Sequence, residues 1–370
     1  MTCIALSGYY GFYNTGDEAI LEAIIGIVRR RLPGAELVVF SADPDHTRQE
    51  YGVESVSRTC LFSIFRTLHR ADLLISGGGG LLQDVTSLRS VAYYLGMIEL
   101  AFFMGKKVAV FAQGMGPLHH PLARRWVKRV LNKVDLISVR DPLSAAFLEE
   151  LGVGREIRVA ADPVFTLSPA SPQEIETFWA RHKMAKAGRQ QPHIGIALRF
   201  FPREQDSGEE IFEMLTRACI YLVQRYNARL VFLPYHLSRD LPLARQIASG
   251  LSQQSLVIDC PLSNKENMCL VGGLDMLVGM RLHALIFAAV SGIPFLALPY
   301  DPKVNAFLGR LGKNPLPPLQ EMTLERLKKD LDIVLAEGKK NFTIGLRAKI
   351  RELEGEVEKA AGELLSLVEN

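Results

Sequence analysis

Two side chains that could bind or protonate an anion stand inside an otherwise apolar stretch, residues 275–294. Arg281 carries a fixed positive charge, and the imidazole of His283 can take up or release a proton. The residues before them, DMLVG (275–279), have the composition of a buried strand, and LHALIFAAV (282–290) that of a helix. We therefore expect both side chains on the turn at the carboxyl end of a strand, where parallel α/β sheets bind ligands, and not on the solvent face of a helix.

Three more cationic or titratable residues follow apolar strands in the second half of the chain. They are Arg199 in ALRFFPR, His236 in LPYHLSRD and Lys303 in PYDPKVN. Each has a plausible structural role when taken alone. Their common position indicates a site for a small polyanion that carries, for example, a phosphate and a carboxylate.

Glycine-rich turns follow three strands of the first half: GYYGFYNTGDEAIL (8–21), SGGGG (76–80) and FAQGMGP (111–117). Gly8, Gly11 and Gly16 do not have the spacing of a dinucleotide fingerprint, and no Lys-Ser/Thr pair completes a P-loop. Successive glycines let the backbone approach a ligand and leave amides free to bind it. The turns therefore predict binding contacts, with Gly78, Gly79 and Gln113 as members.

The first of these turns also carries hydrogen-bonding and acidic side chains. Tyr13 and Asn14 precede Asp17 and Glu18, which open the next helix. An aromatic face with polar groups beside it suits a sugar. Asp17 could equally be a helix cap, because acidic residues there favour the helix dipole.

Arg140 ends another strand, and Asp141 stands directly after it. Pro142 marks the start of a helix, so Asp141 is expected as its N-cap. The forked guanidinium of Arg140 suits an acidic ligand. The alternative is a plain ion pair between Arg140 and Asp141.

Short apolar runs alternate with longer helical patterns along the whole chain, which is typical of parallel α/β sheets. In the first half we expect helices over 17–31, 86–104, 121–133 and 142–151, and strands over 3–6, 36–40, 72–76, 107–111, 135–139 and 156–160. In the second half we expect strands over 193–198, 229–234, 256–259, 275–279 and 294–298.

The polar, proline-containing stretch 168–192 is the expected linker between two domains. It divides the chain into a Rossmann-like domain over 1–167, a second one over 193–338 and a C-terminal helix over 339–370. The predicted fold class is α/β, with the two domains facing across a cleft that holds the ligand.

The composition argues against several classes of protein. The 370 residues carry a net charge of only +3, which argues against a nucleic-acid-binding protein. Five cysteines without a C-x-x-C pair indicate neither a disulfide framework nor a zinc site, and no metal ligand cluster is evident. The longest apolar run, 284–300, is too short to span a membrane, and the N-terminus lacks the features of a signal peptide. These features predict a cytoplasmic protein.

One helical stretch, PLARRWVKRVLNK (121–133), is strongly basic, with Arg125, Arg129 and Lys133 four residues apart. Such a face could simply be solvated. It could also make peripheral contact with an anionic membrane, such as the inner face of the plasma membrane.

Taken together, the stretches GYYGFYNTGDEAIL, ISGGGGLLQD, FAQGMGP, SVRDPLS, ADPVF and MRLHALIFAAVSGIPFLALPYDPKV resemble the polysaccharide pyruvyl transferases, and within them the bacterial cell-wall ketal-pyruvyl transferases. The resemblance covers most of the chain. It implies a fold similar to the GT-B glycosyltransferases, with the acceptor on the first domain and the donor on the second. It also implies transfer of pyruvate from phosphoenolpyruvate to two hydroxyls of an N-acetylmannosamine residue in a lipid-linked disaccharide. The product would be a 4,6-ketal that later anchors surface-layer proteins, with phosphate released and no cofactor.

The resemblance places the family's Arg, His and Lys positions on Arg140, His283 and Lys303, which we expect to be catalytic. His283 would be the general acid. The expected donor-binding residues are Arg281, Leu282, Arg199 and His236. The expected acceptor-binding residues are Asn14, Asp17, Tyr13, Gly78, Gly79 and Gln113, with Asp17 or Glu18 as the base.

Two other functions remain compatible with these patterns. A GT-B glycosyltransferase or sugar-nucleotide epimerase would need a nucleotide pocket in the second domain, and the region after PYDPK supplies no obvious ribose-binding Glu. A non-catalytic protein of cell-wall assembly could have kept the fold without the activity.

Overall fold

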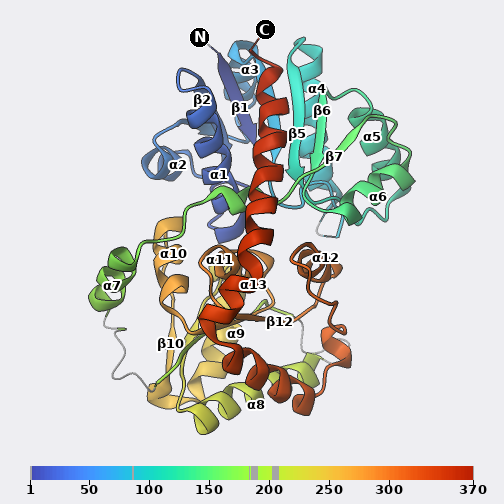
Figure 1. Ribbon diagram of the computed structural model, residues 1–370. Helices are drawn as coiled ribbons and strands as arrows, with labels where there is room; N and C mark the ends of the chain where they lie inside the picture. Colours follow the sequence, from blue (N-terminus) through green and yellow to red (C-terminus); the bar gives the residue numbers. More distant parts are fainter. Residues whose placement is uncertain (1, 86, 183, 185–190, 202–207, 370) are drawn as a thin grey trace. The chain divides into compact units, whose positions relative to one another are not determined.

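The computed structural model describes residues 2–85, 87–182, 184, 191–201 and 208–369. The chain forms two compact units (Figure 1). The first consists of Met1–Leu167 together with Arg351–Asn370, and the second of Ser168–Ile350. Each unit has its own parallel sheet and its own core, and each is described here by itself.

The first unit contains a seven-stranded parallel sheet in the order β3-β2-β1-β4-β5-β6-β7. The strands are β1 (Cys3–Ser7), β2 (Glu36–Ser41), β3 (Glu54–Ser57), β4 (Leu73–Gly77), β5 (Lys107–Gln113), β6 (Leu136–Val139) and β7 (Ile157–Val159). The near-continuous apolar runs of β1, β2, β4, β5 and β6 fit strands that are covered on both faces. The strand order reverses between β1 and β4, which creates a topological switch point at the carboxyl edge.

Helices cover both faces of this sheet. The helices are α1 (Thr15–Arg31), α2 (Pro44–Tyr51), α3 (Leu61–Arg70), α4 (Leu88–Phe103), α5 (Pro121–Leu131) and α6 (Pro142–Leu151), followed by the 3-10 turn η1 (Pro163–Thr166). Residues of α3, α4, α5 and α6 pack into one hydrophobic cluster against the sheet. Figure 1 shows α5 and α6 beside β5, β6 and β7.

The second unit repeats the plan on a smaller scale, with a five-stranded parallel sheet in the order β10-β9-β8-β11-β12. Its strands are β8 (His193–Ala197), β9 (Arg229–Phe232), β10 (Ser255–Val257), β11 (Met276–Gly279) and β12 (Phe295–Ala297). The other elements are α7 (Pro172–Arg181), α8 (Gly208–Tyr226), α9 (Leu237–Ser249), η2 (Ser252–Gln254), α10 (Asn264–Gly273), α11 (Leu282–Val290), α12 (Pro302–Arg310) and η3 (Leu319–Glu321). Here the order reverses between β8 and β11.

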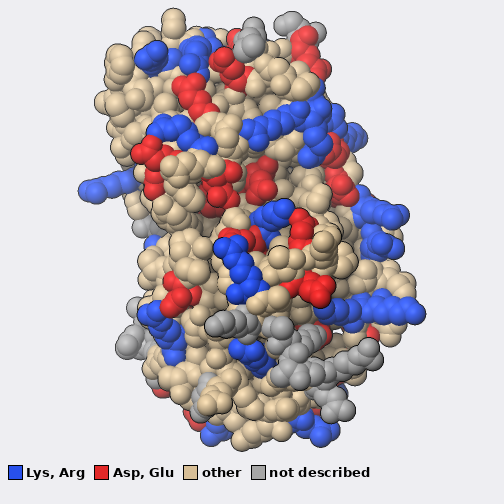
Figure 2. All heavy atoms as spheres, turned by 90° about the vertical axis from the view of Figure 1, so that its left-hand side faces the viewer, with Lys and Arg blue, Asp and Glu red and all other residues tan. Residues whose placement is uncertain are grey.

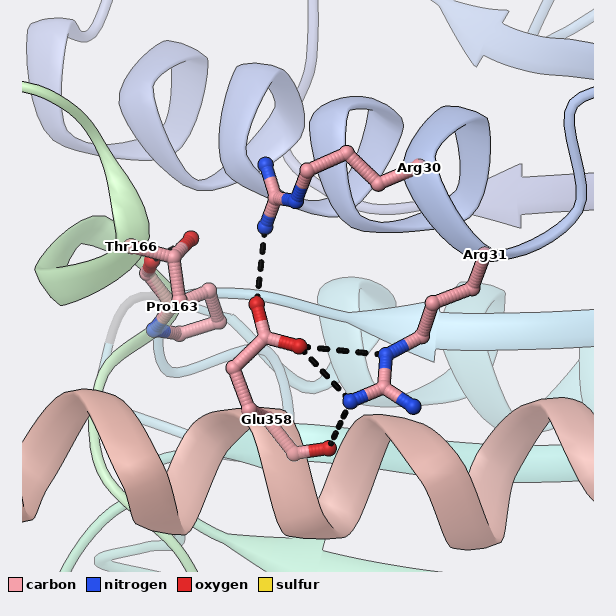
Figure 3. A network of polar contacts seen from close by, with 5 residues as sticks. All are labelled: Arg30, Arg31, Pro163, Thr166 and Glu358. Carbon is pink, nitrogen blue, oxygen red and sulfur yellow. Dashed lines mark hydrogen bonds and ion pairs between the residues drawn. The ribbon is translucent and has the colours of Figure 1, made fainter.

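The last helix, α13 (Leu324–Ser366), belongs to both units and is interrupted at Gly338, whose φ of 66° and ψ of 166° are not helical. Its final part, which belongs to the first unit, packs on α1 of that unit through Glu358 (Figure 3). The Glu358 carboxylate accepts hydrogen bonds from Arg30 and Arg31, both 2.8 Å long, and Arg31 also donates to the Glu358 carbonyl at 2.9 Å. These contacts fix the end of the chain on α1.

Both sheets contain the same kind of hydrogen bond, from a backbone N–H to an aspartate carboxylate. This bond explains why the sequences ADLLISGGGG (71–80) and LDMLVGMRLH (274–283) both have an aspartate before an apolar strand. Asp72 precedes β4, and its carboxylate accepts the backbone N–H of Cys3 at 2.8 Å. Asp275 precedes β11, and its carboxylate accepts the backbone N–H of His193 at the same distance. In both units an aspartate therefore pins the first residue of the first strand to the strand across the switch point.

Most strands lie where the sequence predicts them. The predicted fold class, α/β with two Rossmann-like domains, is confirmed, whereas the cleft between them stays a prediction. The short strand β3, at the edge of its sheet, was not predicted. The expected linker 168–192 includes α7, which packs on α10 within the second unit, while residues 183 and 185–190 of it lie outside the described part.

The glycine turn after β4 has little room for any side chain. Gly78 and Gly79 have φ angles of +87° and +57°, which L-residues rarely adopt. A Cβ atom on Gly79 would lie 2.3 Å from the Asp17 carboxylate, and one on Gly78 would lie 2.7 Å from Ile20. The glycines are thus required by the packing of α1 against this turn.

We expect Gly79→Ala to destabilise the protein by about 2 kcal/mol, because a left-handed backbone and a contact with Asp17 both oppose the added methyl group. Urea-induced unfolding measures this loss. Gly96→Ala is the matched control, since a Cβ at that helical position meets no atom within 4 Å and should stabilise α4 slightly. Equal stability of the two variants would contradict the packing argument.

Candidate active site

The predicted donor-binding residues of the second unit follow the carboxyl ends of its strands. Arg199 follows β8 and His236 follows β9, and Arg281 is the N-cap residue of α11, directly after β11. Leu282 and His283 are the first two residues of α11, and Lys303 is the second residue of α12. The predicted position of Arg281 and His283 at a strand end is therefore confirmed.

A buried carboxylate, Asp240, connects three of these strand ends. It is 1% exposed and forms a bidentate pair with Arg281, with Nε at 2.9 Å and Nη2 at 2.6 Å. Its two oxygens also accept the backbone N–H groups of Phe200 at 3.1 Å and His236 at 3.0 Å. Asp240 thus holds together the segments that follow β8, β9 and β11, on both sides of the switch point.

The guanidinium of Arg281 therefore has a fixed orientation as well as a charge. Its side chain is 17% exposed, and Asp240 binds Nε and Nη2 of the guanidinium but not Nη1. The pair with Asp240 reduces the net charge that Arg281 can offer an anion. It also fixes the direction of the guanidinium, which lowers the entropy cost of binding.

His236 is held in its neutral form. Burial, followed by the neighbouring charges of Arg281 and Arg239, lowers the pKa of its imidazole below the usual value, against the opposing effect of Asp240. At neutral pH this ring is therefore a hydrogen-bonding group and not a cation. Its Nδ1 lies 3.1 Å from the hydroxyl of Ser238.

The other three residues are partly buried. The guanidinium of Arg199 lies over the ring of Tyr300, 4.7 Å from its centroid, and so packs on the segment after β12. Asp301 caps α12 through the backbone N–H of Lys303 at 2.9 Å. His283 lies in the first turn of α11, where the helix dipole favours anions.

In the first unit, the loop between β1 and α1 is held from inside by Glu18. The Glu18 carboxylate accepts the backbone N–H of Gly11 at 2.8 Å and the hydroxyl of Tyr51 at 2.9 Å. Burial raises the pKa of Glu18, although these two hydrogen bonds act in the opposite direction. Because Glu18 already supports the loop, Asp17 is the better candidate for a base that contacts the acceptor.

Asn14 and not Asp17 is the N-cap of α1, because the Asn14 side chain accepts the backbone N–H of Gly16 at 3.2 Å. Asp17 is buried in the first turn, facing Gly79 of the next strand-end turn. Tyr13 is 41% exposed and donates its hydroxyl to Asp43 at 2.7 Å. Of the residues predicted to bind the acceptor, Asn14 thus caps α1, and Tyr13 is exposed to solvent.

The turns after β4, β5 and β6 are joined by backbone hydrogen bonds. Gly114 donates its N–H to the Gly79 carbonyl at 2.8 Å, and Arg140 donates its N–H to the Gln113 carbonyl at 3.2 Å. Gln113 is fully buried, and its amide donates to the Ser76 hydroxyl at 3.2 Å. The structure therefore brings Gly79, Gln113 and Arg140 together at one edge.

Arg140 is buried, with a side chain only 7% exposed. It pairs with Asp162 at 3.2 Å and with Asp141 at 3.7 Å, and Asp141 is the N-cap of α6, as predicted. Gly114 covers the guanidinium, because a Cβ there would lie 2.9 Å from Nε. The ion pair considered as the alternative to ligand binding is thus present, and the catalytic role of Arg140 stays a prediction.

The predicted site residues form two groups. Arg140 lies at the carboxyl edge of the first sheet, whereas His283 and Lys303 lie at that of the second. Their convergence on one ligand stays a prediction. The sequence reasoning missed Asp240 and Asp162, which hold Arg281 and Arg140. The signal that could have found Asp240 is its place four residues after His236, in the first turn of a helix.

Within the described residues, no group of three or more His, Cys, Asp and Glu side chains is arranged to hold a metal ion. In the same part of the chain, no helix has the length and apolar composition needed to cross a bilayer. Figure 2 shows basic and acidic side chains interspersed on the face it presents. This mixture agrees with the small net charge.

We expect Asp240→Ala to destabilise the protein by about 3 kcal/mol or more, because it leaves Arg281 partly buried without its partner and two backbone N–H groups without an acceptor. Chemical denaturation measures this effect. Asp259→Ala is the control, since Asp259 forms an exposed pair with Arg245 and should change the free energy of unfolding by less than about 1 kcal/mol. Similar losses in both variants would contradict the central role of Asp240.

Among solved structures of similar fold are several proteins whose sequences are only distantly similar to this chain. Anabaena HepE, solved in complex with UDP-glucose, superposes with a TM-score of 0.66 at 13% identity, covering 99% of each chain. A glycosyltransferase from Rickettsia africae gives 0.65 at 10% identity, covering 100% of this chain and 99% of that one. The UDP-GlcNAc 2-epimerase of Methanocaldococcus jannaschii gives 0.60 at 13% identity, covering 95% and 98%. These similarities show a GT-B-like fold. No curated protein matches the sequence significantly.

The family follows from the sequence itself. The model of the polysaccharide pyruvyl transferase family matches residues 14–302, a range that begins in the loop after β1 and ends at the start of α12. It therefore includes Asn14, the glycine turns after β4 and β5, Arg140 and the Asp240–Arg281 pair, whereas Gly8, Gly11 and Lys303 lie outside it. The chain belongs to the polysaccharide pyruvyl transferase family.

Proposed function

We propose that this transferase moves pyruvate from phosphoenolpyruvate to two hydroxyls of an N-acetylmannosamine residue in a lipid-linked cell-wall disaccharide. The product is a 4,6-ketal, and phosphate is released. The observation that best supports the proposal is the edge of the second sheet, where Arg281 is fixed by Asp240 beside the segments that carry Arg199 and His236. A dianionic donor of three carbons suits this set of hydrogen-bond donors.

The reaction needs one proton on carbon, two new carbon–oxygen bonds and one broken one. The methylene carbon of phosphoenolpyruvate takes a proton and becomes the methyl group of the ketal. Both acceptor oxygens form bonds to the central carbon of phosphoenolpyruvate. The bond from that carbon to the phosphate oxygen breaks. Of the two hydroxyl protons released, one balances the proton taken up by carbon and the other leaves with phosphate.

The residues of the second unit have separate roles in this proposal. His283 donates the proton to the methylene carbon, since an imidazole is suited to proton transfer near neutral pH. Arg281 and Lys303 bind the phosphate and carboxylate and stabilise the charge as phosphate leaves, with Leu282, Arg199 and His236 lining the donor. His236 contributes hydrogen bonds, because its lowered pKa keeps it neutral.

The first unit supplies the acceptor side of the proposal. Asp17 accepts a hydroxyl proton, and Tyr13, Asn14, Gly78, Gly79 and Gln113 contact the sugar. Arg140 contributes its charge from the edge of the first sheet, where Asp141 and Asp162 hold its guanidinium. The proposal includes no resident cofactor or metal ion, and it places the protein in the cytoplasm. The ketal made there would anchor surface-layer proteins at a later stage, on the cell surface.

Incubation of the purified protein with phosphoenolpyruvate and a disaccharide acceptor carrying a lipid mimic tests this function. We expect phosphate release together with the mass increase of a pyruvate ketal on the acceptor. In thermal unfolding, phosphoenolpyruvate should raise the melting temperature and UDP-sugars should not. Stabilisation by UDP-sugars alone would instead support a glycosyltransferase or epimerase, and absence of any turnover would support a non-catalytic role.

We expect His283→Gln to lower the rate of phosphate release by about 100-fold or more, because the general acid is lost. Stabilisation by phosphoenolpyruvate should persist, since the arginines and the lysine remain. His182→Gln is the control, as that exposed histidine packs, in a tilted arrangement, on Phe178 in α7 of the same unit. Full activity of His283→Gln would contradict the assignment.

The helix α5 is proposed to touch an anionic membrane through its basic face. Arg124 pairs with Glu150 and Arg129 with Glu99, whereas Arg125, Lys128 and Lys133 are exposed. Replacing the last three with glutamine should weaken binding to vesicles of phosphatidylglycerol by about tenfold. Turnover of a soluble acceptor should be unchanged. Vesicle binding equal to that of the natural chain would remove α5 from the contact.

A further inference from the structure

Large apolar side chains are exposed to solvent at the beginnings of three helices of the first unit. Leu61, Phe62 and Phe65 on α3 are 79%, 75% and 52% exposed. Val85 and Leu88, at the start of α4, are 66% and 45% exposed, and Leu122 on α5 is 65% exposed. We refer to these six residues as the apolar rim.

The apolar rim lies along one edge of the first sheet. Helices α3, α4 and α5 each follow a strand of the parallel sheet, so each begins at its carboxyl edge. On α3, Ile64, Thr67 and Leu68 face the core, which directs Leu61, Phe62 and Phe65 outward. The rim therefore shares its edge with the glycine turns of the candidate acceptor site.

The three sequence segments that carry the apolar rim are basic, although Asp84 directly precedes Val85. The sequence contains no Asp or Glu in 58–70, 85–98 or 117–134, and each of these segments carries at least one arginine. Four arginines close to the rim, Arg58, Arg66, Arg89 and Arg125, form no ion pair with any residue that the structure describes. Apolar side chains flanked by unpaired cations are characteristic of surfaces that enter the interface of an anionic bilayer.

Arg58, three residues before Leu61 in the sequence, contacts aromatic residues of α4 and of the loop between β1 and α1. Its guanidinium lies 5.0 Å from the ring centroid of Phe12 and 4.2 Å from that of Tyr93 in α4. Phe12 in turn stacks on Tyr9, with centroids 4.1 Å apart. The segment that leads into α3 is therefore in contact, through Arg58, with aromatic residues of the candidate acceptor loop.

We propose that the apolar rim inserts into the headgroup region of a bilayer that contains anionic lipids, with α3 as the main contact. Binding to the bilayer follows from the rim itself, and only its use, the presentation of a lipid-linked acceptor to the first unit, rests on the proposed function. A second copy of the chain is the less suitable partner, because a two-fold contact would bring the unpaired arginines of both copies together.

Sedimentation with vesicles tests the contact. The variant Leu61→Ser/Phe62→Ser/Phe65→Ser should bind vesicles of phosphatidylglycerol and phosphatidylcholine about tenfold or more weakly than the natural chain. Phe103→Ser is the matched control. Phe103 is 84% exposed at the end of α4, at the opposite edge of the sheet, and its replacement should leave binding unchanged. Equal binding of the triple variant and the natural chain would overturn the proposal.

Cys60, directly before α3, allows a second measurement. Cys60 and Cys260 are exposed, whereas Cys3, Cys219 and Cys269 are buried, so Cys260→Ser leaves one reactive thiol. A polarity-sensitive fluorophore on Cys60 should shift to shorter wavelength when vesicles containing phosphatidylglycerol are added, and not with phosphatidylcholine alone. An unchanged spectrum with both vesicle types would contradict insertion at α3.

Two further readouts separate the possible outcomes. Turnover of a soluble disaccharide by the triple variant should equal that of the natural chain. If the natural chain binds vesicles but shows no turnover, the proposed function is refuted and the membrane docking is not. Size-exclusion chromatography without lipid should give the same size for both proteins. A dimer that the triple substitution converts to a monomer would identify the apolar rim as a contact between copies and would overturn membrane docking.

Discussion

The carboxylate of Asp240 is the constraint on which the candidate donor site depends. A parallel sheet brings the ends of β8, β9 and β11 to one edge. Asp240 joins the segments that follow these strands, since it binds the Arg281 side chain and the backbone N–H groups of Phe200 and His236. A buried ion pair contributes little net stability, so its main consequence is the fixed direction of Arg281.

In the first unit, backbone hydrogen bonds at glycines join the turns that follow the strands. Its turns approach one another through glycines, with Gly114 bonded to Gly79 and lying over Arg140. Where the second unit holds an arginine partly exposed, the first buries Arg140 between two aspartates. The two sheets have the same plan but present different surfaces: backbone and small polar groups on one edge, oriented side-chain donors on the other. That difference agrees with a neutral sugar on one unit and a small anion on the other.

The exposed surface of the first unit also agrees with an acceptor sugar that binds to this unit. Its apolar rim, its unpaired arginines and the aromatic residues around Arg58 lie at the edge that holds the candidate acceptor loop. An acceptor with a lipid anchor cannot leave the bilayer without exposing its chain to water, so an enzyme that uses it benefits from reaching the membrane. A soluble donor requires no such surface.

The sequence by itself determined the alternation of strands and helices, the glycine turns and the place of Arg281 and His283, because hydrophobic period and turn chemistry are local properties. It could not reveal β3, whose four residues carry little pattern, or the pairing of Asp240 with Arg281, which lie 41 positions apart. Nor could it show that Arg140 is buried between Asp141 and Asp162 or that Leu61, Phe62 and Phe65 are exposed. Those facts depend on which segments the folded sheet brings together and which helix faces it leaves uncovered, and only the tertiary structure decides that.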